Sequence, residues 1–202
     1  MLGLPKQTEI KRQLPKSAIY TKFQMNNVQK EKIDADISKM VLVNEILPST
    51  VNIVAGNNID CFFVVNVTLK HKDFDEKSII AISKLISQNL LFALECEDEL
   101  CLAIHHSKLI KSEWQPKENV KIELKGLDLD SVWENIIKQI GDIQVSQGKT
   151  LDEQIAIDDK KAKLEKEIAR LEKQARNEKQ PKKKFELVQC INNFKQELSS
   201  LS

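Results

Sequence analysis

The spacing of apolar residues divides the chain into a middle region of strands and helices and a final region of helical repeats. Five runs are rich in β-branched and aromatic residues or alternate apolar with polar ones, which predicts strands. They cover residues 39–47, 59–70, 90–95, 100–106 and 119–126. The acidic stretch at 96–99 is short, so the strands on either side of it are expected to form an antiparallel hairpin.

Two segments of the middle region change to helical spacing. Residues 73–87 place Ile79, Ile82 and Ile86 on one stripe, and residues 131–141 form the second predicted helix. Capping boxes are expected at Asp73–Glu76 and Ser131–Glu134. The resulting order predicts an α+β fold, with a mainly antiparallel sheet and packed helices. A ferredoxin-like arrangement is one candidate among several.

The first 36 residues repeat Leu-Pro-Lys at Leu4 and Leu14. Each proline pushes the residue before it away from helical dihedrals. With Thr8 and Ser17 as candidate N-caps, the pattern predicts two short helical turns, followed by a helix over 27–38. Apolar residues of this segment are expected to dock on the protein's own sheet or on a partner.

The last 53 residues read as a separate unit, which gives a core domain over 1–149 and a helical segment over 150–202. Apolar residues at Ile157, Leu164 and Leu171 repeat every seven positions, with Ile168 and Ala175 between them and Lys161 interrupting. Pro181 breaks the pattern, and a second amphipathic helix follows. The segment is predicted to be an antiparallel helical hairpin, a short coiled coil, with a single kinked helix as the alternative.

Two helices alone bury little surface. The hairpin is therefore expected to rest on its own core domain, on another copy or on a partner. The apolar residues of its two helices form the predicted partner-binding set. This set is Ile157, Leu164, Ile168, Leu171, Val188, Ile191 and Leu198.

Charge is nearly balanced overall, with 31 basic and 30 acidic residues, so nucleic-acid contact would need a local patch. Residues up to Lys32 carry seven cations against two anions, a local charge of +5. The candidate nucleic-acid-binding residues are Lys11, Arg12, Lys16, Lys182, Lys183 and Lys184. Lysines at helix ends also serve simply to complement the helix dipole and keep a surface hydrated.

The chain has no apolar run of the length that crosses a bilayer, and its first residues lack the apolar core of a signal peptide. A cytoplasmic location is expected. The four cysteines, Cys61, Cys96, Cys101 and Cys190, form no CxxC pair. They are expected to be free and mostly buried thiols.

Several stretches in combination resemble a bacterial family of domains of unknown function, numbered 4391. They are LGLPKQTEIKRQLPKSAIY, VLVNEILPSTVNI, ISQNLLFALECEDELCLAIHHSK and EKQPKKKFELVQCINNFKQELSSL. At Val43–Ile46 the chain departs from the Trp and Lys expected there. The resemblance implies no catalytic residues. It implies a genomic context beside helicases and DNA methyltransferases, in clusters typical of antiphage defence.

Candidate chemistry is sparse. Glu123-Leu124-Lys125 fits the (D/E)xK triple of Mg²⁺-dependent nucleases, with Glu97, Asp98 or Asp60 as the other acid. A charged pair at this spacing is also what ordinary strand alternation produces. His71, His105 and His106 match no zinc spacing, although His71 and one of the pair would meet near Cys61 or Cys101 if their strands were neighbours.

Phosphate-binding loops and nucleophile elbows are not indicated, since Gly148-Lys149-Thr150 lacks the glycine that a P-loop requires before it. We therefore expect no metal and no cofactor. The first hypothesis is a non-catalytic accessory or interaction subunit of a bacterial DNA-processing or antiphage defence complex, with a helicase or methyltransferase partner. The alternative is a nucleic-acid-binding or Mg²⁺-dependent nuclease subunit, and a homo-oligomer fits either.

Overall fold

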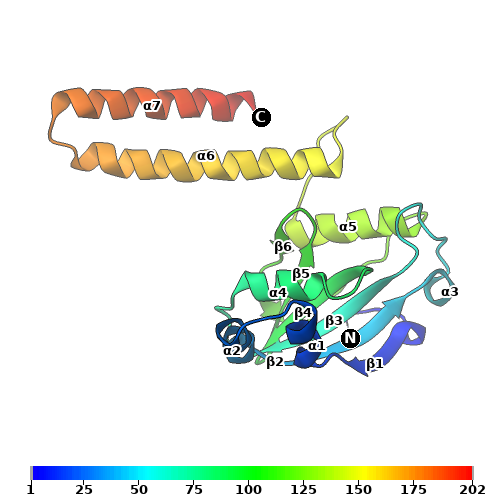
Figure 1. Ribbon diagram of the computed structural model, residues 1–202. Coiled ribbons are helices and arrows are strands. Elements are labelled where there is room, and N and C mark those ends of the chain that lie inside the picture. Colours follow the sequence, from blue (N-terminus) through cyan, green and yellow to red (C-terminus); the bar gives the residue numbers. More distant parts are fainter. Residues whose placement is uncertain (1, 202) are drawn as a thin grey trace. The chain divides into compact units, whose positions relative to one another are not determined.

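The computed structural model describes residues 2–201 and divides into two compact units, the first ending at Ile143 and the second beginning at Gln144 (Figure 1). The first unit is α+β and the second is a pair of helices, as the sequence predicts. No helix in the described part of the chain combines the length and the apolar character that a bilayer crossing requires.

The first unit is built on a seven-stranded sheet with the order β1-β2-β3-β4-β5-β6, in which β7 also pairs with β5. Its strands are β1 (Glu9–Gln13), β2 (Ile37–Ile46), β3 (Phe62–Leu69), β4 (Asn89–Cys96), β5 (Glu99–His105), β6 (Leu109–Lys111) and β7 (Gln115–Pro116). Strands β3 and β4 are parallel and the other pairs are antiparallel. Because the strands lie in chain order, the ferredoxin-like arrangement, which interleaves them, is wrong.

Helices cover both faces of this sheet. The helical elements of the first unit are η1 (Lys6–Thr8), α1 (Lys16–Lys22), α2 (Asn27–Asp36), α3 (Pro48–Val51), α4 (Glu76–Ser83) and α5 (Leu129–Gly141). Helix α4 provides the crossover that a parallel β3–β4 pair needs. Residues of α1, α2 and α4 pack on one face, and α5 packs on β5 and β6.

The core of the first unit comes from strands with apolar residues on both sides. Ile19, Ile33 and Ile79 bring three helices onto Val65, Val67 and Phe92, and all six side chains are at most 2% exposed. On the opposite face Trp133 of α5 packs against Phe62, with ring centroids 5.0 Å apart. Burial on both faces explains why β3 and β4 read as nearly continuous apolar runs.

Two expectations for the N-terminal segment are wrong. The stretch between the two prolines starts with the short 3-10 turn η1, but Glu9–Gln13 form the edge strand β1 and not a helix, because their backbone completes the antiparallel ladder of β2. Thr8 caps no helix. It is buried, and its hydroxyl donates to Pro5 O and accepts from Asn44 Nδ2.

The predicted strand at 119–126 is also wrong. This segment is irregular and belongs to no ladder, and several of its backbone groups are bonded elsewhere. Ile122 N–H donates to Leu2 O, and the Gln139 amide of α5 bonds both backbone groups of Glu123. The expected capping boxes of α4 and α5 are replaced by the N-caps Asp75 and Asp128.

The second unit is the predicted helical hairpin, formed by α6 (Leu151–Asn177) and α7 (Pro181–Ser200) (Figure 1). A capping box of Thr150 and Glu153 starts α6. The chain reverses between Asn177 and Pro181, so the alternative of a single kinked helix is wrong. The two helices contact one another along their length.

Candidate functional site

A short apolar seam holds the hairpin together. Its buried members are Ile168, Leu171 and Ala175 of α6 and Ile191 of α7, with exposures of 6–8%. Leu187, Phe194 and Leu198 pack against them and are only partly buried. The seam is thus much thinner than the core of the first unit, where many side chains are completely enclosed.

Ion pairs join the helices beside the seam. Lys195 Nζ lies 2.7 Å from Glu172 Oε1, and Lys160 Nζ lies 2.7 Å from Glu197 Oε1. The hydrogen bond from Lys195 lowers the pKa of Glu172 below its usual value. These side chains are solvent-exposed, so they set the register of the two helices more than they stabilise them.

Most of α7 faces solvent. Ile191 is the residue of α7 that is buried, while Phe185 and Val188 remain 63% and 40% exposed. Phe185 and Val188 are one helical turn apart and share a side of α7 that lies off the seam. An exposed Phe beside an exposed Val is typical of a surface that a partner covers.

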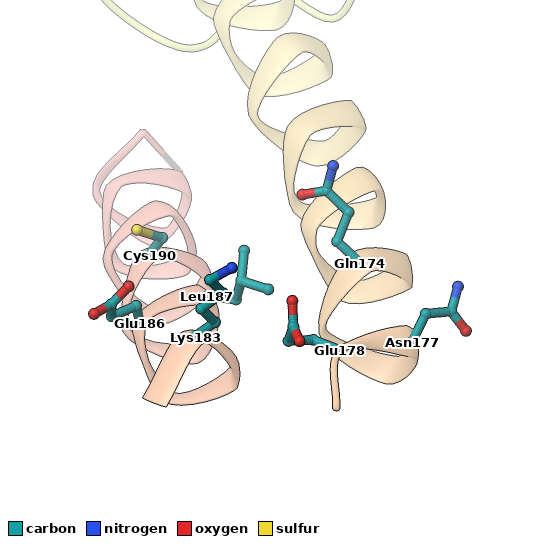
Figure 2. A pocket seen from close by; sticks show the side chains of 7 residues that line it. All are labelled: Gln174, Asn177, Glu178, Lys183, Glu186, Leu187 and Cys190. Atoms are coloured by element: carbon teal, nitrogen blue, oxygen red, sulfur yellow. The ribbon is translucent and has the colours of Figure 1, made fainter. Parts of the chain in front are cut away.

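A pocket of about 660 Å³ lies between α6 and α7 near the turn of the hairpin (Figure 2). Leu187 and Gln174 extend into the space between the helices, whereas Asn177 points away. The rest of the lining is polar, from Glu178, Lys183, Glu186 and Cys190. This pocket forms because the described seam has no buried side chain nearer to the turn than Ala175 of α6 and Ile191 of α7.

The predicted partner-binding residues fall into two groups. Ile168, Leu171, Ile191 and Leu198 belong to the hairpin seam, where they hold the two helices together. Ile157 and Leu164 are half-buried, and Val188 is exposed. Sequence analysis did not place Phe185 in the set, although its distance of three residues from Val188 is a signal that finds it.

The predicted nucleic-acid-binding cations differ in how far they are engaged. Lys16 is paired with Asp34 at 2.7 Å, and the hydrogen bonds from Lys16 and Tyr20 lower the pKa of Asp34. Lys11 and Arg12 lie exposed on the edge strand β1. Lys182, Lys183 and Lys184 are exposed in the first turn of α7.

The candidate catalytic residues gather into no site. Glu123 and Lys125 form an ion pair with one another, and Lys125 lowers the pKa of Glu123. Both are exposed on the irregular segment before α5, while Glu97 occupies the β4–β5 turn in the left-handed region at φ 53°. Within residues 2–201, no group of three or more His, Cys, Asp or Glu side chains is placed to hold a metal ion.

The neighbours and burial of the histidines and cysteines favour structural roles for these residues. His71 comes two residues after β3, and His105 is the last residue of β5. Strand β4 separates these two strands, so the condition under which the histidines would meet is not fulfilled. His105 Nδ1 lies 3.0 Å from Ser83 Oγ, but that hydroxyl donates to Ile80 O. Burial lowers the pKa of His105. The four cysteines are free, and burial raises the pKa of Cys61 and Cys101.

The fold and its surfaces define a class of protein: an α+β unit that carries a helical hairpin with an uncovered apolar side. Residues 2–198 match the family described as Domain of unknown function (DUF4391), and the chain belongs to this family. This confirms the resemblance seen in the sequence. Neither the curated proteins nor the solved structures contain a match to the chain.

Proposed function

We propose that this protein is a non-catalytic accessory subunit that joins a larger bacterial DNA-processing or antiphage defence complex through its hairpin. The observation that carries the proposal is the uncovered side of α7, where Phe185 is 63% exposed on a helix with one buried residue. A two-helix unit with so thin a seam gains most when a third surface packs on it.

The charges at the hairpin tip, the turn and the first residues of α7, indicate which kind of partner surface fits. Lys182, Lys183 and Lys184 are exposed directly before Phe185, so the apolar side of α7 is bordered by cations at its N-terminal end. A partner surface that fits is an apolar groove with acidic residues at one end, which receives α7 as a helix. Desolvation of Phe185 and Val188 then supplies affinity, and the lysines supply orientation.

The genomic context implied by the family resemblance supports a DNA helicase or a DNA methyltransferase as the partner. Enzymes of this kind carry their own catalytic residues, so an accessory subunit beside them needs shape and charge only. The pairing of Glu123 with Lys125 on an exposed segment favours this role over catalysis.

The experiment is affinity purification of the tagged full-length protein from its native host, followed by mass spectrometry. The wild-type protein is expected to bring down one helicase or methyltransferase in a fixed ratio. Phe185→Ser combined with Val188→Ser is expected to lose that partner by at least about tenfold, the scale of truncating interface anchors. Gln189→Ser, an exposed polar position directly after Val188 on the same helix, is the matched control and should retain the partner.

Two results contradict the proposal. One is recovery of the wild-type chain as a free monomer, and the other is retention of the same partner by the double variant. Circular dichroism checks that the hairpin of each variant is still helical, which is expected because both substituted side chains are exposed.

A second candidate function, contact with DNA, is supported by the three consecutive exposed lysines of the hairpin tip. Gel-shift titrations at several salt concentrations test it. Replacing Lys182, Lys183 and Lys184 by serine should reduce the slope of log affinity against log salt by roughly 0.9 for each phosphate contact removed. An unchanged slope removes the tip as a DNA-binding site.

A further inference from the structure

The edge strand β1 borders a groove of about 720 Å³, which is within the range of ligand-binding clefts. Ile10, Leu42, Phe63, Leu85 and Ile86 contribute apolar side chains to its walls. Apart from Leu42, these side chains are only partly buried against the core of the first unit. An apolar side chain that enters the groove would therefore complete their removal from water.

The same groove carries one guanidinium. Arg12 lines it from β1, and the described residues offer Arg12 no hydrogen bond or ion pair. Arginine binds carboxylates through two parallel hydrogen bonds. Glu45 of β2 is the carboxylate in the lining, so the groove presents opposite charges and favours a ligand that carries both an acid and hydrogen-bond donors.

The backbone of β1 adds a second binding element. Leu14 N–H donates to Met40 O at 3.0 Å, and Arg12 pairs with Leu42 in the antiparallel register. Because backbone groups alternate along the regular part of this ladder, those of Arg12 point toward β2, and those of Gln13 point away from the sheet. Exposed edge groups of this kind are templates for an added strand.

The charges of β1 decide between possible occupants. β1 carries two cations, Lys11 and Arg12, against one anion, Glu9, so a second copy of β1 would bring a net like charge across the strand pair, which is destabilising. An extended segment with acidic residues has the opposite charge and meets no such repulsion. The edge is thus protected against self-association and open to an acidic partner strand.

We propose that β1 and its groove bind an extended segment of a partner protein in which apolar and acidic residues alternate. The segment adds a strand outside β1, places an apolar side chain against Ile10 at the entrance of the groove, and pairs a carboxylate with Arg12. The inference rests on the proposed function only in requiring a protein partner, and it concerns a surface on the other unit of the chain.

The test is selection from a phage-displayed library of random short peptides on the full-length protein, followed by fluorescence anisotropy with the best synthetic peptide. Selected peptides are expected to alternate apolar and acidic residues. Arg12→Glu should weaken binding by about tenfold or more, with Lys163→Glu, an exposed charge reversal on α6, as its control. Gln13→Pro removes one outward-facing N–H, leaves the β2 ladder intact, and should weaken binding about fivefold or more.

Three outcomes overturn the inference: selection without enrichment, enrichment of basic peptides, or binding that survives both Arg12→Glu and Gln13→Pro. A short DNA duplex that requires Arg12 and ignores Gln13→Pro also overturns it, because phosphate needs no strand edge. Phe185→Ser should leave peptide binding unchanged. Failure of this inference is therefore distinguishable from failure of the hairpin proposal.

Discussion

The two units of this chain bury their apolar residues to different degrees. In the first unit, Phe62, Phe92 and Leu94 are completely enclosed, and many further Leu and Ile side chains are fully buried. In the hairpin the best-covered seam residues keep 6–8% of their surface exposed. The first unit therefore carries its own stability, whereas the hairpin is a folded but thinly packed element.

This difference indicates where each kind of function is placed. A completely packed sheet offers a rigid platform with a groove at its edge, while a thin hairpin offers apolar surface that a partner can complete. The thin packing lowers the stability of the hairpin only in the isolated protein. In a complex, another chain covers the exposed apolar surface, and this burial contributes to binding.

The largest predicted effect compares one residue from each unit. Phe92→Ala should lower the free energy of unfolding by about 3–5 kcal/mol, and Ile191→Ala by roughly 1–2 kcal/mol. Both tryptophans, Trp114 and Trp133, lie in the first unit, so their fluorescence reports that unit and circular dichroism reports both. Ile191→Ala should change the helical signal and leave the fluorescence midpoint in place. Equal shifts of both midpoints would contradict the conclusion that the two units unfold separately.

The next effect concerns a loop clamp in the first unit. The Asp130 carboxylate accepts hydrogen bonds from the backbone N–H groups of Asn57, Asn58 and Ile59. Asp130→Ala leaves these donors unpaired and should lower the fluorescence midpoint by an amount equivalent to about 1–3 kcal/mol. Glu134→Ala, one turn later on α5 and solvent-exposed, should lower it far less. If both variants lowered the midpoint by similar amounts, the loss of stability would come from a weakened α5 helix and not from the lost hydrogen bonds of Asp130.

Raising the pH should lower the stability of the first unit through Tyr20. Burial, followed by the hydrogen bond to Asp34, raises the pKa of Tyr20 to about 12. The folded state thus holds this proton more tightly than the unfolded one, whose pKa is about 10. The contribution is complete below about pH 10 and is lost as the pH rises toward 12. Tyr20 is the chain's one tyrosine, so phenolate absorbance follows it directly, and titration near 10 would contradict the contact.

The smallest predicted effect on stability is at the proposed interface. Phe185→Ser should leave both unfolding midpoints nearly unchanged, because the ring is 63% exposed and has little burial to lose. The same change should reduce partner recovery from the host. A large fall in the helical midpoint would instead place Phe185 in the packing of the hairpin.

Much of the fold could be predicted because its elements carry strong local patterns. The β4–β5 hairpin follows from two apolar runs around an acidic turn, and the α6–α7 hairpin follows from heptads broken by Pro181. The local sequence pattern fails to predict a strand when its pairing depends on residues that are distant in the sequence. β1 looks like a helical start, yet the register with Asn44, Leu42 and Val41 makes it a strand.

The surfaces were harder to predict for a similar reason. Heptad spacing identifies Ile168 and Leu171, and the amphipathic pattern of the second helix identifies Ile191. Neither pattern shows that these side chains pack against one another within the hairpin. The groove beside β1 needs Ile10, Phe63 and Ile86 from three separate segments, and no local pattern joins them. The sequence therefore predicts which residues are apolar better than it predicts which of them remain uncovered.

Hydrogen exchange of the α7 backbone, measured in the isolated chain and in the complex purified from its host, shows directly whether a partner covers this helix. We expect fast exchange along α7 in the isolated chain and protection by at least about tenfold in the complex, with β3 and β4 protected equally in both. Equal protection of α7 in the two samples would contradict the claim that a partner completes the hairpin.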